Sequence, residues 1–597
     1  MAHRIDLELA PSDREPEELD GDELLALARE AAPDLDLAAA RLVSFSFDAR
    51  ARVRRWRLRL EAYAPGEPVA APPSAPTPIA PPPAAAPHVV VVGSGPAGLV
   101  AALDLLAAGL RVTLLERGFD VQRRRVDLAR LHRGHAVDRD SNYCHGEGGA
   151  GTYSDGKLYT RSGKPDEVRG LLELLVAHGA PSTILADWRP HIGSNRLPKV
   201  VASMTEAVRA GGGEVRFGAR VVALETRAGQ DGPEVVGVEV EQRAVDRDAR
   251  DEPPARAERL ACDAVVLATG HSALDALALA ARAGARLEAK GFAMGLRIEH
   301  PQPWLDELQY GGLRGPCALP AAFYELVTER KGRGVYSFCM CPGGFVVPAT
   351  TGPGRAVVNG MSLSRRDSPF ANSGVVVAVE PEDLCGGRGL RWGAAALVRA
   401  AVEGGGDPFG AARELVGDAD RLAEGWLPDD PSDAPLVGVV VQRALELEAA
   451  RWAREAAGPD PAGLDHNRVP AQRADHFAAG RGQVGAPLAT SYQAGLVGVD
   501  LARALPRGLS ERLRKGLAEF DARMPGYAGA EGQVLGVESR TSSPVRLPRD
   551  GSTCEAAGLT GLFPAGEGAG YAGGIVSAAL DGARVARGVV ARLGARR

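Results

Sequence analysis

Cys339 and Cys341, in the stretch "SFCMCPGG", have the type and spacing that point most directly to chemistry in this 597-residue chain. In a strand, residues i and i+2 share a face, so we expect both thiols to point the same way. One interpretation is a redox pair that relays electrons. The other is structural, because this spacing lies near the limit of disulfide geometry and thiols are common small core groups. Two thiols are too few for zinc, and Cys144–His145 adds ligands only if the fold brings them close, so we expect no metal site.

Charged residues supply the other candidates for chemistry. Lys157 follows Asp155–Gly156 in a turn, where it either pairs with a bound cofactor or anion or is an exposed turn lysine. Arg540 and Arg546 flank a hydroxyl-rich stretch; two arginines can grip a carboxylate or phosphate, or can simply pack. His271 is either an acid–base group or a histidine without a catalytic role at a helix start. The candidates for catalysis are therefore Lys157, Cys339, Cys341 and Arg540.

A glycine turn lies between an apolar strand and a helix in "HVVVVGSGPAGLVAALDLL". Gly93 permits the tight turn, Gly95 lets the backbone approach a pyrophosphate, and Gly98 lets helix and strand pack closely. The helix start presents free N–H groups and a positive dipole end to phosphates. Glu116 ends the next strand, where a carboxylate can accept hydrogen bonds from ribose hydroxyls. Together these features predict dinucleotide binding.

A second glycine turn lies far downstream, in "GLFPAGEGAGYAGGIVSAAL", residues 561–580. A strand runs into Gly566–Glu567–Gly568, and a helix begins near Gly573. The chain has no second GxGxxG–acid unit that would complete a separate nicotinamide domain. One long cofactor contacted at both ends by a single chain explains both turns, which favours FAD. The dipole of the last helix would then stabilise the anionic reduced flavin.

The positions of these turns predict an α/β chain with a discontinuous, Rossmann-like FAD-binding domain. Strand and helix signals alternate over residues 88–291, and residues 538–597 supply the last strand and helix. Residues 292–537 form an inserted α+β substrate domain. A Pro/Ala-rich linker, residues 64–87, should be extended and solvated. It precedes this body and follows a small α+β module, residues 1–63.

Composition excludes several classes of function. The net charge is −6 and the pI near 6.1, which argues against nucleic-acid binding because no basic stripe is present to displace counterions. Seven cysteines in so long a chain do not form a disulfide framework. The N-terminus lacks the pattern of a signal peptide, and the most apolar stretch is interrupted by glycines and charges. We expect a cytoplasmic protein without a membrane span.

Several motifs together resemble those of the glutathione reductase-like, two-dinucleotide-binding FAD flavoproteins, and within them the group known only as FAD-dependent dehydrogenases or oxidoreductases. The matching stretches span nearly the whole chain outside the linker. They are "SFDARARVRRW", "GSGPAGL", "GEGGAGTYSDGKL", "ATGHSA", "SFCMCPGG", "ESRTSSPVRLPRD" and "GEGAGYAGGI".

The resemblance implies FAD bound without a covalent link. One departure is Glu567, where many members have aspartate; its longer side chain can still reach a ribityl hydroxyl. The implied cofactor contacts, including those of the two turns, are Gly93, Ser94, Gly95, Pro96, Ala97, Gly98, Glu116, Arg117, Gly149, Ala150, Gly151, Ser154, Asp155, Gly156, Val221, Ala268, Thr269, Gly270, Gly566, Glu567, Gly568, Gly573, Gly574 and Ile575.

The expected activity is hydride transfer between flavin N5 and a small-molecule substrate that the sequence does not identify. One alternative is a reductase or an oxygen-using hydroxylase to which NAD(P)H docks as a transient electron donor. Another is a redox-sensing flavoprotein that docks a protein partner through its N-terminal module.

Overall fold

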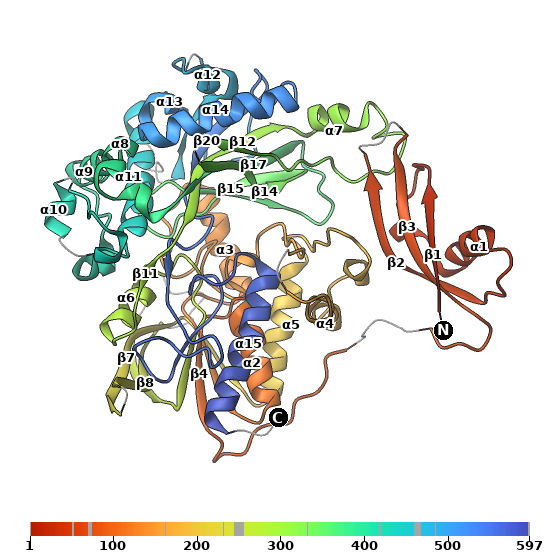
Figure 1. Cartoon of the computed structure of the whole chain (residues 1–597), viewed down its shortest axis with the longest axis horizontal. Helices are drawn as coiled ribbons and strands as arrows, with labels where there is room; N and C mark the ends of the chain where they lie inside the picture. Colours follow the sequence, from red (N-terminus) through yellow and green to blue (C-terminus); the bar gives the residue numbers. More distant parts are fainter. Residues whose placement is uncertain are drawn as a thin grey trace.

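The computed structural model describes residues 2–49, 53–69, 75–160, 163–230, 232–243, 256–330, 332–416, 419–424, 426–458, 467–483 and 485–594. The N-terminal module lies at one side of a larger body (Figure 1). Its antiparallel sheet has the order β1 (His3–Leu9), β3 (Arg55–Tyr63), β2 (Ala39–Asp48), and α1 (Gly21–Ala31) packs on one face. The Asp20 carboxylate caps α1 by accepting hydrogen bonds from the N–H groups of Asp22 and Glu23.

The part of the body nearest the chain ends is built on a five-stranded parallel sheet. Its order is β22 (Leu562–Pro564), β10 (Ala264–Leu267), β4 (His88–Val92), β5 (Arg111–Glu116), β6 (Glu214–Phe217). The strands are continuous apolar runs because helices bury both faces of such a sheet. β22 comes from the far end of the chain, so the predicted discontinuous Rossmann-like fold is confirmed.

Two helices, α2 (Pro96–Ala107) and α15 (Ile575–Leu593), lie side by side over this sheet (Figure 1). Small residues permit the close approach, because a Cβ added to Gly582 of α15 would lie 2.1 Å from the carbonyl oxygen of Ala97. Two helices more than 450 residues apart in the sequence are thereby in contact at a point where only glycine fits. The helix expected near Gly573 begins at Ile575.

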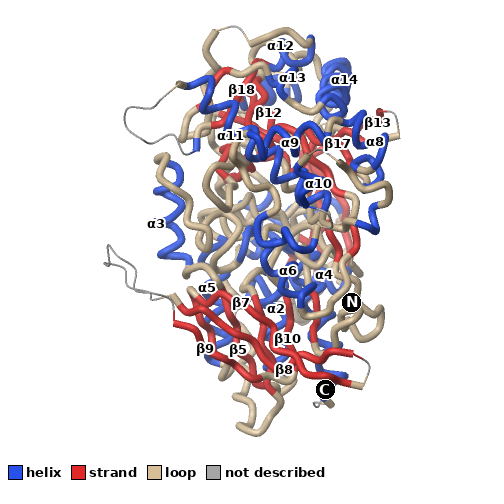
Figure 2. Tube along the Cα trace, turned by 90° about the vertical axis from the view of Figure 1, so that its left-hand side faces the viewer, coloured by secondary structure: helices blue, strands red, loops and turns tan. Residues whose placement is uncertain are grey.

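A seven-stranded sheet is the second large sheet of the body. It lies in the upper part of the molecule in Figure 2, with helices around it. All its strands lie between Phe292 and Glu538, within or one residue beyond the predicted substrate domain; the exact domain boundaries stay a prediction. Their order is β13 (Val327–Arg330), β14 (Arg333–Cys341), β17 (Phe370–Val379), β12 (Phe292–Pro301), β20 (Gln533–Glu538), β18 (Val469–Arg473), β19 (Leu496–Gly498).

The remaining elements connect or cover these sheets. A three-stranded sheet of β7 (Ala219–Gly229), β8 (Gly232–Gln242) and β9 (Arg256–Ala261) flanks the parallel sheet. Two short pairs are β11 (Glu288–Ala289) with β21 (Val545–Arg546) and β15 (Gly344–Pro348) with β16 (Val358–Ser362). The other helices are α3 (Val121–His132), α4 (Pro165–Ala177), α5 (Leu197–Ala210), α6 (Leu274–Arg282), α7 (Gln302–Tyr310), α8 (Gly386–Trp392), α9 (Ala394–Glu403), α10 (Ala419–Ala423), α11 (Val437–Ala457), α12 (Ala474–Ala479), α13 (Leu501–Ala504) and α14 (Arg507–Arg523).

The N-terminal module packs directly against the body. Phe45 of β2 exchanges backbone hydrogen bonds with the segment around Asp187, and its ring shares the large core of the body with Trp56 and Leu58. Residues 64–69 and 75–87, the described parts of the linker, contain no helix or strand, and Ile79 packs on the core of the parallel sheet. Within the described ranges, no helix is long and apolar enough to cross a membrane.

Candidate active site

A cavity of about 440 Å³ opens at the carboxyl ends of the parallel strands β4, β5, β10 and β22. This is the edge at which open α/β sheets bind their ligands. The cavity continues past this edge to β14 and β16 of the seven-stranded sheet, so side chains of both sheets face it. Most of the predicted cofactor contacts line it: Gly93, Gly95, Pro96, Ala97, Glu116, Arg117, Gly149, Ala150, Gly151, Ser154, Asp155, Gly156, Val221, Ala268, Thr269, Gly270, Gly566, Glu567, Gly573, Gly574 and Ile575.

The remaining three predicted contacts lie behind the cavity wall. The Ser94 side chain turns away to the Glu116 carboxylate. A Cβ added to Gly98 would lie 1.9 Å from the carbonyl oxygen of Gly93, and one added to Gly568 would lie 2.5 Å from that of Gly270. These glycines therefore support the wall through backbone packing.

Other glycines leave empty space on the cavity side. This space shows whether a dinucleotide could approach the backbone. A Cβ added to Gly95 meets no protein atom closer than 3.9 Å, and none lies within 4 Å at Gly270, Gly573 or Gly574. Gly270 and Gly574 have φ values of 72° and 142°, which favour glycine by themselves. Gly95 and Gly573 do not, and the absence of side chains there keeps the cavity open to a ligand that approaches the backbone, as the FAD hypothesis requires.

Two helix N-termini face this space. α2 begins after Gly95 and α15 after Gly574, and neither helix has a side chain that caps its first N–H groups. Uncapped N–H groups and the positive dipole end favour an anion. The two ends match the two ends expected for one FAD, pyrophosphate at α2 and flavin ring at α15.

Glu116 does not offer a free carboxylate. It accepts hydrogen bonds from Ser94 N and Ser94 Oγ at 3.0 and 2.9 Å, and from the N–H groups of Gly118 and Gly146, each at 2.9 Å. Four donors fill the acceptor sites of a carboxylate. In this structure the residue ties the glycine turn to two loops, and a ribose contact requires one of these bonds to be exchanged.

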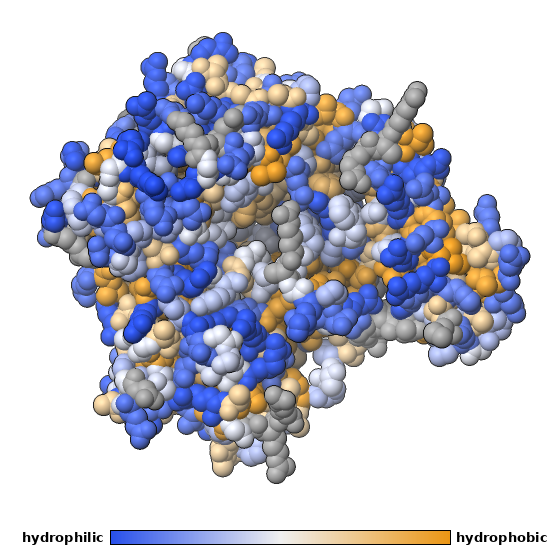
Figure 3. Space-filling model, viewed as in Figure 1, coloured by the Kyte–Doolittle hydropathy of each residue, from blue (hydrophilic) through white to orange (hydrophobic). Residues whose placement is uncertain are grey.

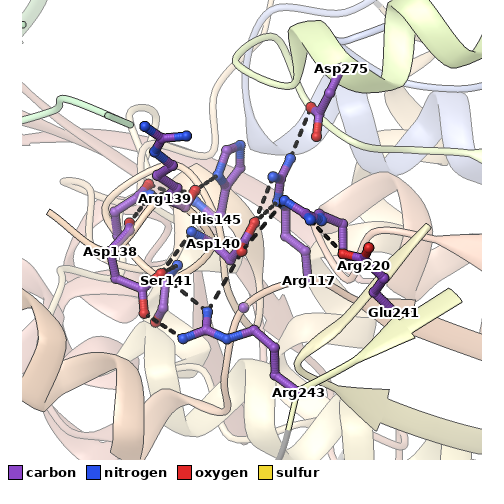
Figure 4. Close-up of polar contacts among 12 residues, drawn as sticks. Arg117, Asp138, Arg139, Asp140, Ser141, His145, Arg220, Glu241, Arg243 and Asp275 are labelled. Carbon is purple, nitrogen blue, oxygen red and sulfur yellow. Dashed lines mark hydrogen bonds and ion pairs between the residues drawn. The ribbon is translucent and has the colours of Figure 1, made fainter. Parts of the chain in front are cut away.

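Arg117 is held in the same way (Figure 4). Its Nε and Nη2 donate to Asp140 at 2.8 and 2.6 Å, and its Nη1 donates to Asp275 at 3.0 Å. Arg243 binds Asp138 of the same loop, with N–O distances of 3.2 and 3.1 Å. This network gives the cavity a rigid charged rim beside β5.

At the opposite end of the cavity, Lys157 lies among two thiols and a carboxylate. Its Nζ donates to the Met340 carbonyl at 2.5 Å and lies 3.4 Å from Asp155, 3.7 Å from Cys339 Sγ and 4.0 Å from Cys341 Sγ. Burial disfavours the ammonium, but the two thiols and Asp155 outweigh it and raise the pKa of Lys157. Lys157 is thus a half-buried, permanently charged group and not an exposed turn lysine.

The two thiols differ in electrostatic character. A hydrogen bond with Cys341, with the charges of Lys157 and Arg297, holds the pKa of Cys339 well below the ordinary thiol value. The same hydrogen bond, with burial, raises the pKa of Cys341. Cys339 lines the cavity and Cys341 lies behind it, fully buried. The structure therefore presents one activated sulfur to the cavity and a second one beneath it.

Strand alternation does not explain why both thiols meet Lys157. The pairing of β14 with β17 shifts register between Phe338 and Cys341, and Cys339 has a φ of 45°, in the left-handed region. Both thiols do lie near Lys157, but regular i, i+2 alternation is not the cause. The bulge changes the direction of the Cys339 side chain. Positive φ at a residue with a side chain is costly and is found mainly at functional sites.

Arg540 is engaged with a buried partner. Its Nε and Nη2 each donate to Glu446 at 2.7 Å, and its Nη1 donates to Thr351 at 2.8 Å. Arg546 does not line the cavity and instead lies over the ring of Tyr571. The two arginines therefore do not form the predicted pair that grips a substrate anion. His271 lines the cavity, with Nδ1 3.6 Å from Glu567 Oε2.

Several lining residues were missed by sequence reasoning. Tyr159 lies two residues after Lys157, which forms an isolated β-bridge with His191, and both side chains face the cavity. The alternation of side chains in extended backbone was the sequence signal that could have identified Tyr159. Asn359 reaches the cavity from β16, and no sequence signal links it to the glycine turns. Other missed residues are Cys144, His145, Arg220, Asp275 and Phe338. Among the residues that the structure describes, no cluster of three or more potential metal ligands occurs.

Comparisons with known proteins agree with this architecture. The chain matches the model of the pyridine nucleotide-disulphide oxidoreductases over residues 87–288. Residues 291–418 and 424–541 match that of the FAD-dependent protein, C-terminal domain-like family. An uncharacterised protein of Clostridium beijerinckii is 36% identical over 508 residues, which is 84% of this chain and 80% of the relative.

Solved structures resemble the chain only distantly. A 3-ketosteroid-Δ4-(5α)-dehydrogenase of Rhodococcus jostii is 14% identical, with 88% of this chain and 100% of that chain covered and a TM-score of 0.30. The glycerol-3-phosphate dehydrogenase of Bacillus halodurans, complexed with FAD, is 12% identical over 50% of this chain and 48% of that chain, with a TM-score of 0.25. Scores this low carry no argument. The family is shown by the two family matches and the relative from Clostridium beijerinckii: the chain belongs to the FAD-dependent oxidoreductases of the two-dinucleotide-binding flavoprotein superfamily.

Proposed function

We propose that this oxidoreductase binds FAD without a covalent link in the glycine-lined cavity and acts on a small organic molecule. FAD bound there would supply the exchange of a hydride at its N5 atom. The residues that would hold it are the Gly93–Gly98 turn, the Gly149–Gly151 turn, Thr269, Gly270 and the start of α15. The supporting observation is a single cavity faced by two uncapped helix N-termini whose nearby glycines serve no internal contact.

The chain's own residues suggest how a proton is handled. A substrate that loses a hydride also loses a proton, and the Cys339 thiolate is positioned to accept it at Sγ. Lys157 stabilises that thiolate from 3.7 Å and loses this stabilising interaction once the sulfur is protonated. Arg297, fully buried, supports the same region by donating to the Cys339 carbonyl and pairing with Glu538 at 2.9 Å. Lys157, Arg297 and Arg540 are then positioning residues.

A second candidate is reduction by NAD(P)H that docks transiently. The match of residues 87–288 to the pyridine nucleotide-disulphide oxidoreductases favours it. In that case Cys339 and Cys341 would act as an electron-accepting pair: their disulfide form takes two electrons and two protons from the reduced flavin and becomes two thiols, the state in this structure. The proton-acceptor role needs only Cys339, whereas the dithiol needs both sulfurs.

The test is the visible spectrum of the purified protein, followed by anaerobic titration with NADH and NADPH. We expect the purified protein to show a flavin spectrum. Denaturation should release the flavin, because no covalent bond holds it. Protein that stays colourless after incubation with excess FAD contradicts the proposal. Bleaching by NADPH identifies the electron donor. Comparison of Cys339→Ser with Cys341→Ser separates the two roles, since equal loss of turnover in both variants favours the dithiol.

A further inference from the structure

A second and larger cavity, of about 1190 Å³, lies between the N-terminal module and the body. Three residues line both this cavity and the glycine-lined one: Lys157, Tyr159 and Cys339. The activated thiol is therefore in the wall that the two cavities share. Neither the family matches nor the motif analysis assigns any role to this space.

The module builds one side of this cavity. Phe47 packs at 5.0 Å from Trp56 and at 5.6 Å from Tyr310 of α7, ring centroid to ring centroid. All three rings line the cavity. Hydrophobic residues gather on the sheet of the module and on the neighbouring part of the body in the space-filling view (Figure 3). Without the module, this side of the cavity would be open.

The opposite side carries aromatic rings that remain exposed. Trp188 and Tyr159 are 54% and 40% exposed, although large apolar side chains usually pack in cores. The Arg189 guanidinium lies over the rings of Trp188 and Phe323, 4.5 and 4.4 Å from their centroids. Rings held in place by a stacked arginine offer a flat, rigid contact surface to a ligand.

Unpaired arginines give the cavity its charge preference. Within the described part of the chain, the guanidinium groups of Arg54, Arg196 and Arg365 line the cavity without a hydrogen bond or ion pair. Asn195 and Ser364 hydrogen-bond to each other at 2.9 and 3.1 Å, which brings the adjacent Arg196 and Arg365 onto neighbouring segments. Arg54 comes from the module and approaches Gly311 at the end of α7.

Carboxylates also line the cavity. Glu15 and Glu17 of the module lie near Asp187 of the body. Burial raises the pKa of each, that of Glu15 to about 7, and Arg196 lies near enough to Glu17 to oppose this rise. Burial therefore weakens the repulsion that these carboxyl groups exert on an anion bound by the arginines.

We propose that this cavity is the substrate site, and that its ligand is a bulky organic anion with a flat apolar part. The rings of both sides contact the apolar part, and Arg196 and Arg365, with Arg54 of the module, bind the carboxylate, sulfonate or phosphate. The wall formed by Lys157, Tyr159 and Cys339 brings the ligand to the redox site. This proposal rests on the proposed oxidoreductase function and names the class of substrate for it.

Two matched probes test it: 8-anilinonaphthalene-1-sulfonate and the uncharged N-phenyl-1-naphthylamine, which share an aromatic frame. Calorimetry on the FAD-containing protein should show tighter binding of the sulfonate. The double variant Arg196→Ala/Arg365→Ala should weaken binding of the sulfonate about tenfold and leave binding of the uncharged probe unchanged, because exposed arginines make modest charge-assisted contacts with an anion. Arg388→Ala on α8, an exposed arginine outside the cavity, should change neither.

The visible spectrum of the flavin gives an independent readout, because a ligand next to the shared wall should perturb it. Equal affinity for the two probes, no effect of the arginine substitutions, or an unperturbed flavin would each overturn the proposal. Displacement of the sulfonate by NADPH would identify the natural anion as a pyridine nucleotide, and no displacement would identify it as the other substrate. Probe binding is measured without turnover, so its failure is separate from a failure of the oxidoreductase function, which appears as protein without flavin.

Discussion

The glycine-lined cavity has two walls that are built on different principles. One wall is backbone, formed by the turns after β4 and β22 and the starts of α2 and α15. The other is made of side chains, among them Lys157, Cys339 and Arg540, each held by partners from remote segments. The backbone wall depends on the absence of side chains: a Cβ added to Gly98 would meet other backbone, whereas one added to Gly95 would occupy only the cavity side. The side-chain wall depends on balanced buried charges.

This difference predicts two kinds of failure. A substitution in the backbone wall should fail by steric clash, independently of pH. A substitution in the side-chain wall should leave a charge without its partner, so its effect should vary with pH. The following variants are ordered by the size of the effect that we expect.

Gly98→Ala should have the largest effect. The added Cβ would lie 1.9 Å from the Gly93 carbonyl oxygen, so either the turn or the helix must move. We expect no flavin-containing protein on purification, judged by the absorbance ratio of flavin to protein.

Gly95→Ala is the matched control, because its Cβ meets nothing in the protein closer than 3.9 Å. This variant should keep the thermal stability of the FAD-free protein but bind FAD more weakly, measured by flavin fluorescence on titration. Equal behaviour of the two variants would show that the backbone wall is not shaped for a ligand.

Arg540→Met should destabilise the protein by about 3–5 kcal/mol, because it leaves the buried Glu446 carboxylate with the Ser539 hydroxyl at 2.7 Å and with Arg355 at 3.6 Å. The midpoint of urea unfolding, followed by circular dichroism, measures this. The double variant Arg540→Met/Glu446→Gln should recover part of the loss, because no unpaired charge remains. A double variant no more stable than Arg540→Met would mean that packing, and not charge, dominates here.

The same pair predicts a pH dependence. Burial opposes the charge of Glu446, but Arg540 outweighs it and lowers its pKa from 4.5 to about 2. The folded-state pKa is depressed, so the stabilisation is present above about pH 4.5 and is lost as the pH falls towards 2. Arg540→Met should therefore show a shallower loss of stability over this acidic range than the unmodified protein.

Lys157→Met should have the smallest effect on stability and a clear effect on Cys339. Removal of an opposite charge 3.7 Å from Sγ should raise the pKa of the Cys339 thiol. Alkylation of Cys339 by iodoacetamide, followed by mass spectrometry of its peptide, should be half-maximal at a higher pH in the variant. Lys199→Met, at an exposed position of α5, serves as the control, and coinciding profiles of all three proteins would contradict the electrostatic assignment.

The backbone wall was largely predictable from sequence. Glycine spacing after an apolar strand has few uses, and both turns fall at the cavity where FAD was expected. The roles of Glu116 and Arg117 were less predictable, since their donors and acceptors, such as Gly146 and Asp275, come from loops whose approach only the fold determines.

The side-chain wall was predictable in identity but not in arrangement. Cys339, Cys341 and Lys157 were all named as candidates, yet their meeting depends on a register shift in β14 that regular alternation does not contain. Arg540 was expected to face a ligand, and its partner Glu446 lies on a helix almost 100 residues earlier in the chain. The strands of the N-terminal module could be predicted from sequence. Nothing in its sequence indicated that it closes the larger cavity.

The last strand and helix of the parallel sheet have a consequence for biosynthesis. β22 and α15 are synthesised long after β4 and β10, yet they complete the edge of the sheet and one end of the cavity that begins at β4. Until β22 is made, β10 has no partner on that side. A cofactor that contacts both ends of the cavity would therefore be fully enclosed only after these last two elements have packed against the early ones.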